Sequence, residues 1–176
     1  MRPAIDLLSQ YAKYHRDQRN ITSHFVGVPM IVVAVGVLLA HPAFTLGGLA
    51  LTPAWLIYAV VAAWYLTRGN LMLGVAGTAV VGGLVLLSHR LVATESLMSG
   101  LAWGVGFFIV GWAIQFIGHW YEGKKPAFVD DILGLIVAPL FITAEALFAL
   151  GWGKALLAEI ERRAGPTMLR DLAKIA

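Results

Sequence analysis

The sequence predicts an all-α fold: a polytopic membrane helix bundle of four to five apolar spans, with an interfacial N-terminal helix and an amphipathic C-terminal tail. The first reason is composition, since 59% of the residues are hydrophobic and only 13% are charged, against roughly a quarter in soluble domains. The second is charge spacing. No Asp, Glu, Lys or Arg lies between Arg19 and Arg68, between Arg68 and Arg90, or between Glu95 and Glu122. A helix crosses a bilayer with about 20 apolar residues, so the first interval holds two spans and each other interval one.

Length and composition also limit domain organisation and function. The 176 residues predict a single integral-membrane domain, with a core at residues 5–150 and an amphipathic tail at 151–176. The absence of cysteine excludes disulfides, thiolate metal sites and cysteine nucleophiles. The net charge of +3 is small and forms no basic stripe interleaved with aromatic residues, so we expect no nucleic-acid partner.

Local signals predict the first two helices. Residues 4–16 form a short interfacial helix, because their apolar side chains recur on one face. Asn20 or Thr22 caps the first span, which runs to about residue 40. Pro29 removes one backbone donor, so it either bends this span or marks where its regular part begins.

The remaining apolar stretches are expected at residues 53–66, 71–87, 97–120 and 132–150. The third span is rich in glycine, and small residues allow helices to pack closely in lipid; these are Gly74, Gly77, Gly82 and Gly83. The last stretch differs from the others because Pro139 and Glu145 interrupt it.

The basic residues predict the orientation, because Lys and Arg favour cytoplasmic loops. They occur before the first span, in the 68–70 turn and in the 123–131 loop, which four spans place on one side. The N-terminus is therefore expected in the cytoplasm, either at a bacterial inner membrane or at the endoplasmic reticulum. A crossing at 132–150 would move the basic tail to the other side (Arg162, Arg163, Arg170 and Lys174), so we favour a re-entrant hairpin broken at Pro139.

This topology brings distant polar residues to the same membrane depth. His15 and His24 lie at the cytoplasmic end of the first span, and His119 and Glu122 lie at that end of the fourth. Residues three or four apart share a helix face, which pairs His119 with Glu122 and His24 with Asn20. His15 and His24 are nine apart and face opposite ways on a continuous helix. We therefore expect the chain to bend at residues 17–20.

Two or three imidazoles with a carboxylate match the ligand set of non-haem iron(II) oxygenases. Zinc hydrolases use a similar set, so the ligands alone do not name the metal. Simpler roles remain open: each histidine could be an interfacial side chain, Asn20 could only cap a helix, and Glu122 could pair with Lys124 or Lys125.

Three other polar residues need separate interpretation. His41 precedes a proline in the opposite loop and is expected to be structural. His89 is expected to be interfacial, and becomes a candidate ligand only under another topology. Glu145 lies in apolar sequence, where a carboxylate needs a partner or a wet cavity, which makes it a candidate functional residue.

Three segments resemble a known family. Residues 14–29 carry the spacing H-x4-N-x3-H-x2-G-x-P; residues 115–127 (QFIGHWYEGKKPA) and 138–141 (APLF) look like a second and a third signature. They are similar to the Mpo family of membrane 2-hydroxy fatty acid dioxygenases, long catalogued as a domain of unknown function. The resemblance covers about residues 5–150.

The resemblance implies iron(II)-dependent α-oxidation, in which a 2-hydroxy fatty acid and dioxygen yield the fatty acid one carbon shorter and carbon dioxide. It places the family histidines at His15, His24 and His119, with Glu122 in the second motif. The expected site therefore consists of Fe(II) held by His15, His24, His119 and Glu122, with Asn20 beside them. Membrane lipid is the expected surrounding. The basic side chains nearby could attract the substrate carboxylate, although solvated surface charge also accounts for them (Arg16, Arg19, Lys124 and Lys125).

Alternatives from other classes remain open. A metal-dependent lipid hydrolase or hydroxylase would use the same ligands on another bond. A small transporter would place polar residues near the membrane midplane, which only Glu145 fits. A purely structural membrane protein would not need the histidines.

Overall fold

The all-α prediction is confirmed by a computed structural model that describes residues 2–46 and 49–172. Residues 173–176 of the predicted tail, including Lys174, lie outside the described part. The elements in chain order are α1 (Ala4–Ala12), α2 (Gln18–Leu38), β1 (Phe44–Leu46), β2 (Leu49–Leu51), α3 (Pro53–Leu66), α4 (Leu71–Val92), α5 (Leu97–Glu122), the short 3-10 helix η1 (Ala127–Val129), α6 (Gly134–Ala149) and α7 (Lys154–Ala164).

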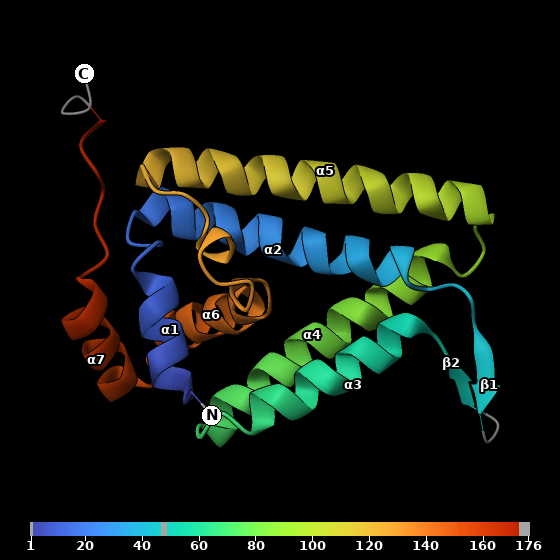
Figure 1. Cartoon of the computed structure of the whole chain (residues 1–176), viewed down its shortest axis with the longest axis horizontal. Coiled ribbons are helices and arrows are strands. Elements are labelled where there is room, and N and C mark those ends of the chain that lie inside the picture. The colour runs from blue at the N-terminus through green and yellow to red at the C-terminus, as the bar shows by residue number, and fades with distance from the viewer. Residues whose placement is uncertain (1, 47–48, 173–176) are drawn as a thin grey trace.

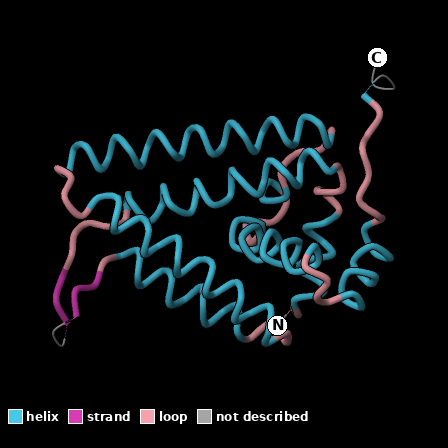
Figure 2. The backbone as a smooth tube through the Cα atoms, turned by 180° about the vertical axis from the view of Figure 1, so that it is seen from behind, coloured by secondary structure: helices cyan, strands magenta, loops and turns pink. Residues whose placement is uncertain are grey.

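The helices form two antiparallel pairs with a helical cap at one end. α2 and α5 run side by side along the length of the molecule, and α3 lies beside α4 (Figure 1). α1, α6 and α7 gather where α2 begins and α5 ends. At the opposite end the connection after α2 forms a small antiparallel hairpin, β1–β2, with Phe44 paired to Leu51 (Figure 2). We expected only a turn region there; the strand pairing gives the backbone groups of this connection partners within the chain.

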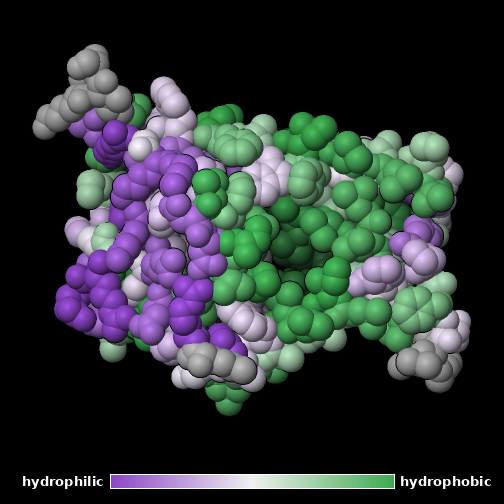
Figure 3. Space-filling model, viewed as in Figure 1, coloured by the Kyte–Doolittle hydropathy of each residue, from purple (hydrophilic) through white to green (hydrophobic). Residues whose placement is uncertain are grey.

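Within the described residues, three helices are long and apolar enough to cross a membrane: α2, α4 and α5. α3 and α6 coincide with the other two predicted stretches but are shorter, at 14 and 16 residues. Many large apolar side chains on these helices are exposed, as at Val60 and Ile109. Hydrophobic residues cover the helical body, while hydrophilic residues gather at the end that holds α1 and α7 (Figure 3). Exposed apolar surface of this extent is typical of contact with lipid.

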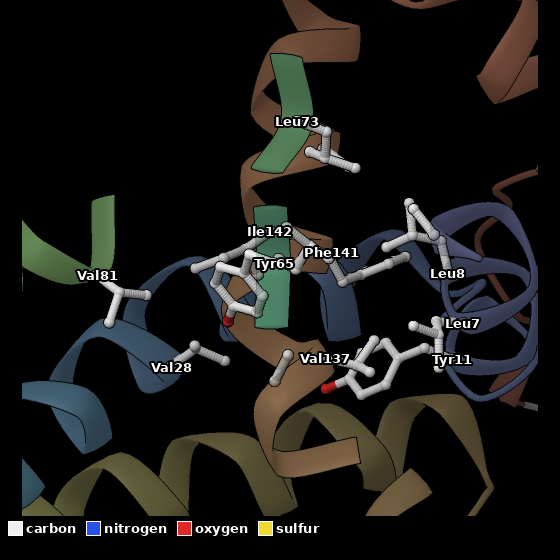
Figure 4. Close-up of a cluster of buried hydrophobic side chains, with 14 of the residues drawn as sticks. Leu7, Leu8, Tyr11, Val28, Tyr65, Leu73, Val81, Val137, Phe141 and Ile142 are labelled. Carbon is white, nitrogen blue, oxygen red and sulfur yellow. The ribbon is translucent and has the colours of Figure 1, made fainter. Parts of the chain in front are cut away.

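The hydrophobic core surrounds α6. Leu7, Leu8 and Tyr11 of α1 and the Tyr65 ring of α3 pack against Phe141 and its neighbours (Figure 4). The Tyr65 hydroxyl is satisfied, because it donates to the Ile136 carbonyl over 2.7 Å. This core holds α1, and therefore the turn that follows it, against the ends of the spans.

Glycines allow the helices to approach closely, as predicted for α4. A Cβ at Gly74 would lie 2.8 Å from the Tyr65 carbonyl oxygen, and one at Gly77 would lie 2.8 Å from Leu140 Cδ1. A Cβ at Gly82 would likewise meet the Tyr58 ring. Gly83 differs, since it faces open space and has no packing role.

The hairpin predicted at Pro139 is wrong, because α6 is one continuous helix across this residue. Pro139 lies in the second turn, where its ring removes one backbone hydrogen bond without ending the helix. Thr143 Oγ1 also donates to the Pro139 carbonyl over 2.7 Å. Burial of Leu140 and Phe141 in the core offsets the lost bond.

The start of α2 also differs from the expectation. Asp17, and neither Asn20 nor Thr22, is the N-cap, and its side chain accepts from the Arg19 backbone N–H over 2.9 Å. Pro29 lies inside α2, so the regular helix begins well before it. The interfacial helix ends at Ala12. The bend that we expected at residues 17–20 therefore lies a few residues earlier, at 13–17.

Candidate metal centre

The three predicted histidines come together where α2 begins and α5 ends. His15 lies in the turn between α1 and α2, His24 lies early in α2, and His119 lies in the last turn of α5. Their side chains are buried, with exposed fractions of 0%, 1% and 6%. One nitrogen from each ring lies within 4.8 Å of the others, and this is the group of possible metal ligands among the described residues.

Hydrogen bonds determine which ring nitrogens are free. His15 Nδ1 lies 2.8 Å from the Tyr11 carbonyl oxygen, and His24 Nδ1 lies 2.8 Å from that of Asn20. A carbonyl oxygen only accepts, so both Nδ1 atoms carry hydrogen and both Nε2 atoms carry bare lone pairs. In metal-binding histidines, the ring nitrogen that does not bind the metal usually donates its hydrogen to a carbonyl or carboxylate oxygen, as Nδ1 does here.

The two bare nitrogens face each other. His15 Nε2 and His24 Nε2 are 3.0 Å apart. A hydrogen bond between them would require a second proton on one ring, and burial opposes the charged form. Two nitrogens that each lie about 2.1 Å from one ion, at right angles, are about 3.0 Å apart. The pair therefore fits a shared divalent metal.

His119 and Tyr11 complete the surroundings of the pair. The His119 ring centroid lies 4.8 Å from that of His15 and 5.1 Å from that of His24. Its Nδ1 is buried and makes no hydrogen bond of good geometry with the described residues. The Tyr11 ring stacks on His15 at 4.0 Å.

Burial, and next the neighbouring histidines, hold the pKa of His15 well below its usual value. The ring therefore stays in the neutral form that binds metals.

Glu122 does not join the histidine group. Its Oε2 accepts from the backbone N–H groups of Arg16 and Asp17, over 2.9 and 2.7 Å, and from the Asn20 amide over 3.2 Å. The carboxylate therefore ties the end of α5 to the turn that carries His15. Lys124 is more distant, with its Nζ 3.9 Å from Glu122 Oε1.

Asn20 links the same segments. Its Nδ2 also donates to the Tyr14 carbonyl over 3.0 Å, and its backbone carbonyl oxygen accepts from His24 Nδ1 over 2.8 Å. The side-chain amide thus connects the turn before α2 to the end of α5, and the backbone carbonyl contacts one candidate ligand.

The nearby basic residues have protein partners. The Arg16 guanidinium is buried and lies 3.4 Å from Glu145, which is the pairing that we considered for this carboxylate. Arg19 contacts both oxygens of Asp17, at 2.9 and 2.7 Å, and these bonds lower the pKa of Asp17 to about 2. Lys125 pairs with Asp130 at 2.6 Å.

His41 and His89 lie away from this centre. His89 Nε2 is 2.8 Å from Thr52 Oγ1, next to the β-hairpin at the other end of the molecule. His41 is exposed in the loop after α2. Neither belongs to the histidine group.

The close contact of α2 and α5 depends on Gly118, which precedes a candidate ligand. A Cβ at Gly118 would meet Ser23 Oγ and would lie 2.6 Å from Asn20 Oδ1. We expect Gly118→Ala to lower the free energy of unfolding in detergent by about 1–3 kcal/mol through overpacking, and to weaken metal binding. Gly106→Ala is the matched control on the same helix, since nothing lies within 4 Å of its Cβ position. Equal stability of the two variants would contradict this account of the contact.

Comparison with known proteins decides the family. Residues 1–150 match the family described as 2-hydroxy-palmitic acid dioxygenase Mpo1-like. The chain belongs to the Mpo1-like family. It is also 32% identical over 163 residues to the 2-hydroxy-palmitic acid dioxygenase MPO1 of Saccharomyces cerevisiae, covering 89% of this chain and 88% of the relative. No solved structure matches the chain. The resemblance inferred from the motifs is confirmed.

In this Mpo1-like protein, the tail after the matched residues contacts the turn that carries His15 and the start of α2. The Met168 N–H donates to the Arg16 carbonyl over 2.8 Å, and the Gln18 N–H donates to the Met168 carbonyl over 2.9 Å. The Arg170 N–H donates to Asp17 Oδ2 over 2.8 Å. We predicted only an amphipathic tail. The sequence of the tail has no signal for this docking, because backbone groups make most of the bonds.

Sequence reasoning also missed Gln115. Its side chain is buried one turn before His119, and it lines a cavity of about 60 Å³ together with His24 and His119. A signal was present: a polar amide in an apolar span, four residues before a candidate ligand.

Proposed function

We propose that this Mpo1-like protein is an iron(II)-dependent membrane dioxygenase that shortens 2-hydroxy fatty acids by one carbon. The main support is the pair of bare nitrogens, His15 Nε2 and His24 Nε2, which face each other at 3.0 Å beside His119. The name of the yeast relative gives the substrate class, 2-hydroxy-palmitic acid. An iron(II) site with three protein ligands leaves positions for substrate and dioxygen.

His15, His24 and His119 would hold the metal. When bound, Fe(II) would supply the redox chemistry that dioxygen requires and a Lewis acid for the 2-hydroxyl and carboxylate oxygens. We assign Glu122 and Asn20 positioning roles, because Glu122 Oε2 and Asn20 Nδ2 connect the His15 turn to α2 and α5. This replaces the ligand role that we expected for Glu122.

The proposed reaction balances with dioxygen as the oxidant. The bond between C1 and C2 breaks, C1 leaves as carbon dioxide, and C2 becomes the carboxyl carbon of the shorter acid. One water is the remaining product. Gln115 donates its amide N–H to the oxygens of the substrate head group, since it lines the cavity beside His24 and His119. The burial of all three rings excludes bulk water from the reacting groups.

The site lies at the hydrophilic end of the molecule, which agrees with a position at the membrane surface. The basic residues at this end favour its cytoplasmic location under the positive-inside rule. The N-terminus would then be cytoplasmic, at a bacterial inner membrane or at the endoplasmic reticulum.

The deciding experiment uses purified protein in detergent, loaded anaerobically with Fe(II). We expect 2-hydroxypalmitate and oxygen to yield pentadecanoate and carbon dioxide in equal amounts, read by mass spectrometry. The zinc-loaded protein is the control and should yield neither product. A product with an unshortened chain would contradict the proposal and favour the hydroxylase or hydrolase alternative.

A further inference from the structure

A second, larger cavity adjoins the candidate metal centre. It encloses about 320 Å³ between α2, α3, α4, α5 and α6, a volume within the range of ligand sites. It shares wall residues with the small cavity beside His24 and His119; these are Ile31, Val32, Trp112, Leu135 and Pro139. Figure 3 shows a hollow in the middle of this face, surrounded by hydrophobic residues.

Among the described residues that line the larger cavity, none has a charged group, an amide side chain or an unpaired hydroxyl, and the indole of Trp112, which also lines the small cavity, contributes one N–H. Tyr58 and Tyr65 are the lining residues with hydroxyls, and each hydroxyl donates to a backbone carbonyl, of Thr78 and Ile136 respectively. The rest of the lining is aliphatic, aromatic or glycine. The small cavity is also largely apolar but has polar groups at one place, because Gln115 and two candidate ligands contribute to its wall.

We propose that the larger cavity binds the alkyl chain of a 2-hydroxy fatty acid, whose head group lies in the small cavity against the histidines. This inference rests on the proposed function. An amphiphile with a small polar head and one unbranched apolar chain matches both cavities at once. A wholly polar substrate would have no apolar chain to fill the larger cavity. An alkane would have no polar group for Gln115 to bind.

The cavity selects by shape more than by hydrophobic burial. The interior of a bilayer is as apolar as the cavity wall, so moving a chain from lipid into the cavity gains little. The available space therefore limits which chains fit. Val61 of α3 lines the larger cavity but not the small one, whereas its neighbour Val60 is 70% exposed on the outer face.

The first test is photo-crosslinking of metal-free protein in detergent with 2-hydroxypalmitate that carries a diazirine near its methyl end. We expect label on the α3 and α4 residues that line the cavity, such as Ile57, Val61, Val81 and Val85. Excess unlabelled 2-hydroxypalmitate should remove it. Label confined to outward residues such as Val60, or label that resists competition, would overturn the inference whatever the activity of the protein.

The second test compares Val61→Phe with Val60→Phe, which adds the same ring to the outer face. The added phenyl ring would fill part of the volume that the alkyl chain is proposed to occupy. We therefore expect Val61→Phe to reduce labelling of the cavity about tenfold or more. The ratio of turnover with 2-hydroxypalmitate to turnover with 2-hydroxyoctanoate should fall by a similar factor. Val60→Phe should keep both values. Bound iron and the melting temperature show whether each variant is folded.

The outcomes separate this inference from the proposed function. The protein could be labelled in the cavity, lose that label to unlabelled competitor, and yet shorten no 2-hydroxy acid. This result would refute the proposed function and support the chain-binding site. Shortening of 2-hydroxypalmitate with equal labelling and equal chain-length preference in both variants would refute the site and keep the function.

Discussion

Iron is expected to be lost from His24→Ala and from His119→Ala, while the helical content of both variants survives. Each substitution removes one of three imidazoles whose nitrogens lie within 4.8 Å of one another. Loss of a supporting residue around a metal typically costs 10–100-fold in affinity, and we expect loss of a direct ligand to cost more. The helices should remain, because none of the backbone hydrogen bonds within α2 and α5 uses an imidazole.

The measurement is iron per protein after anaerobic loading and desalting, with circular dichroism for the helices. His89→Ala is the matched control, since His89 lies at the other end of the molecule beside Thr52. It should keep full iron. Full iron in either His24→Ala or His119→Ala would remove that residue from the proposed site.

Glu122→Ala should have the second large effect, on both stability and metal binding. The carboxylate is the acceptor for the buried N–H groups of Arg16 and Asp17. Leaving a buried donor without a partner costs about 1–3 kcal/mol, so we expect the free energy of unfolding to fall by about 2–6 kcal/mol. Iron affinity should fall about 10–100-fold, because the His15 turn loses its link to α5.

Glu122→Gln separates the positioning role from a ligand role. The amide oxygen of glutamine still accepts hydrogen bonds, so we expect this variant to regain most of the stability and most of the bound iron. Iron loss as severe as in His24→Ala, in a variant that remains folded, would instead make Glu122 a direct ligand.

Hydrophobicity and charge spacing were sufficient to predict where helices form. Lipid-length apolar stretches without charges can satisfy their backbone groups only as helices, and the five stretches predicted from residue 20 to residue 150 coincide with α2 to α6. Pro139 marks the limit of this reasoning. A proline is a local signal against helix, but the packing of Leu140 and Phe141 in the core outweighs it.

The candidate site was only partly predictable. The alternation of spans placed His24 and His119 at the same depth, and the structure brings them together with His15. The partner of Glu122 was not predictable, because its choice between a metal, Lys124 and two backbone N–H groups depends on ångström-scale positions.

The sequence by itself therefore determined the placement of the apolar helices, the end of the bundle where the histidines gather, and the family. These properties follow from residue composition and spacing along one chain. Only the tertiary structure decided the bend at residues 13–17, the bonds of Glu122, the docking of Met168 on the His15 turn, and the cavity beside Gln115. Each of these depends on contacts between segments far apart in the chain, whose relative positions are set by packing and not by local pattern.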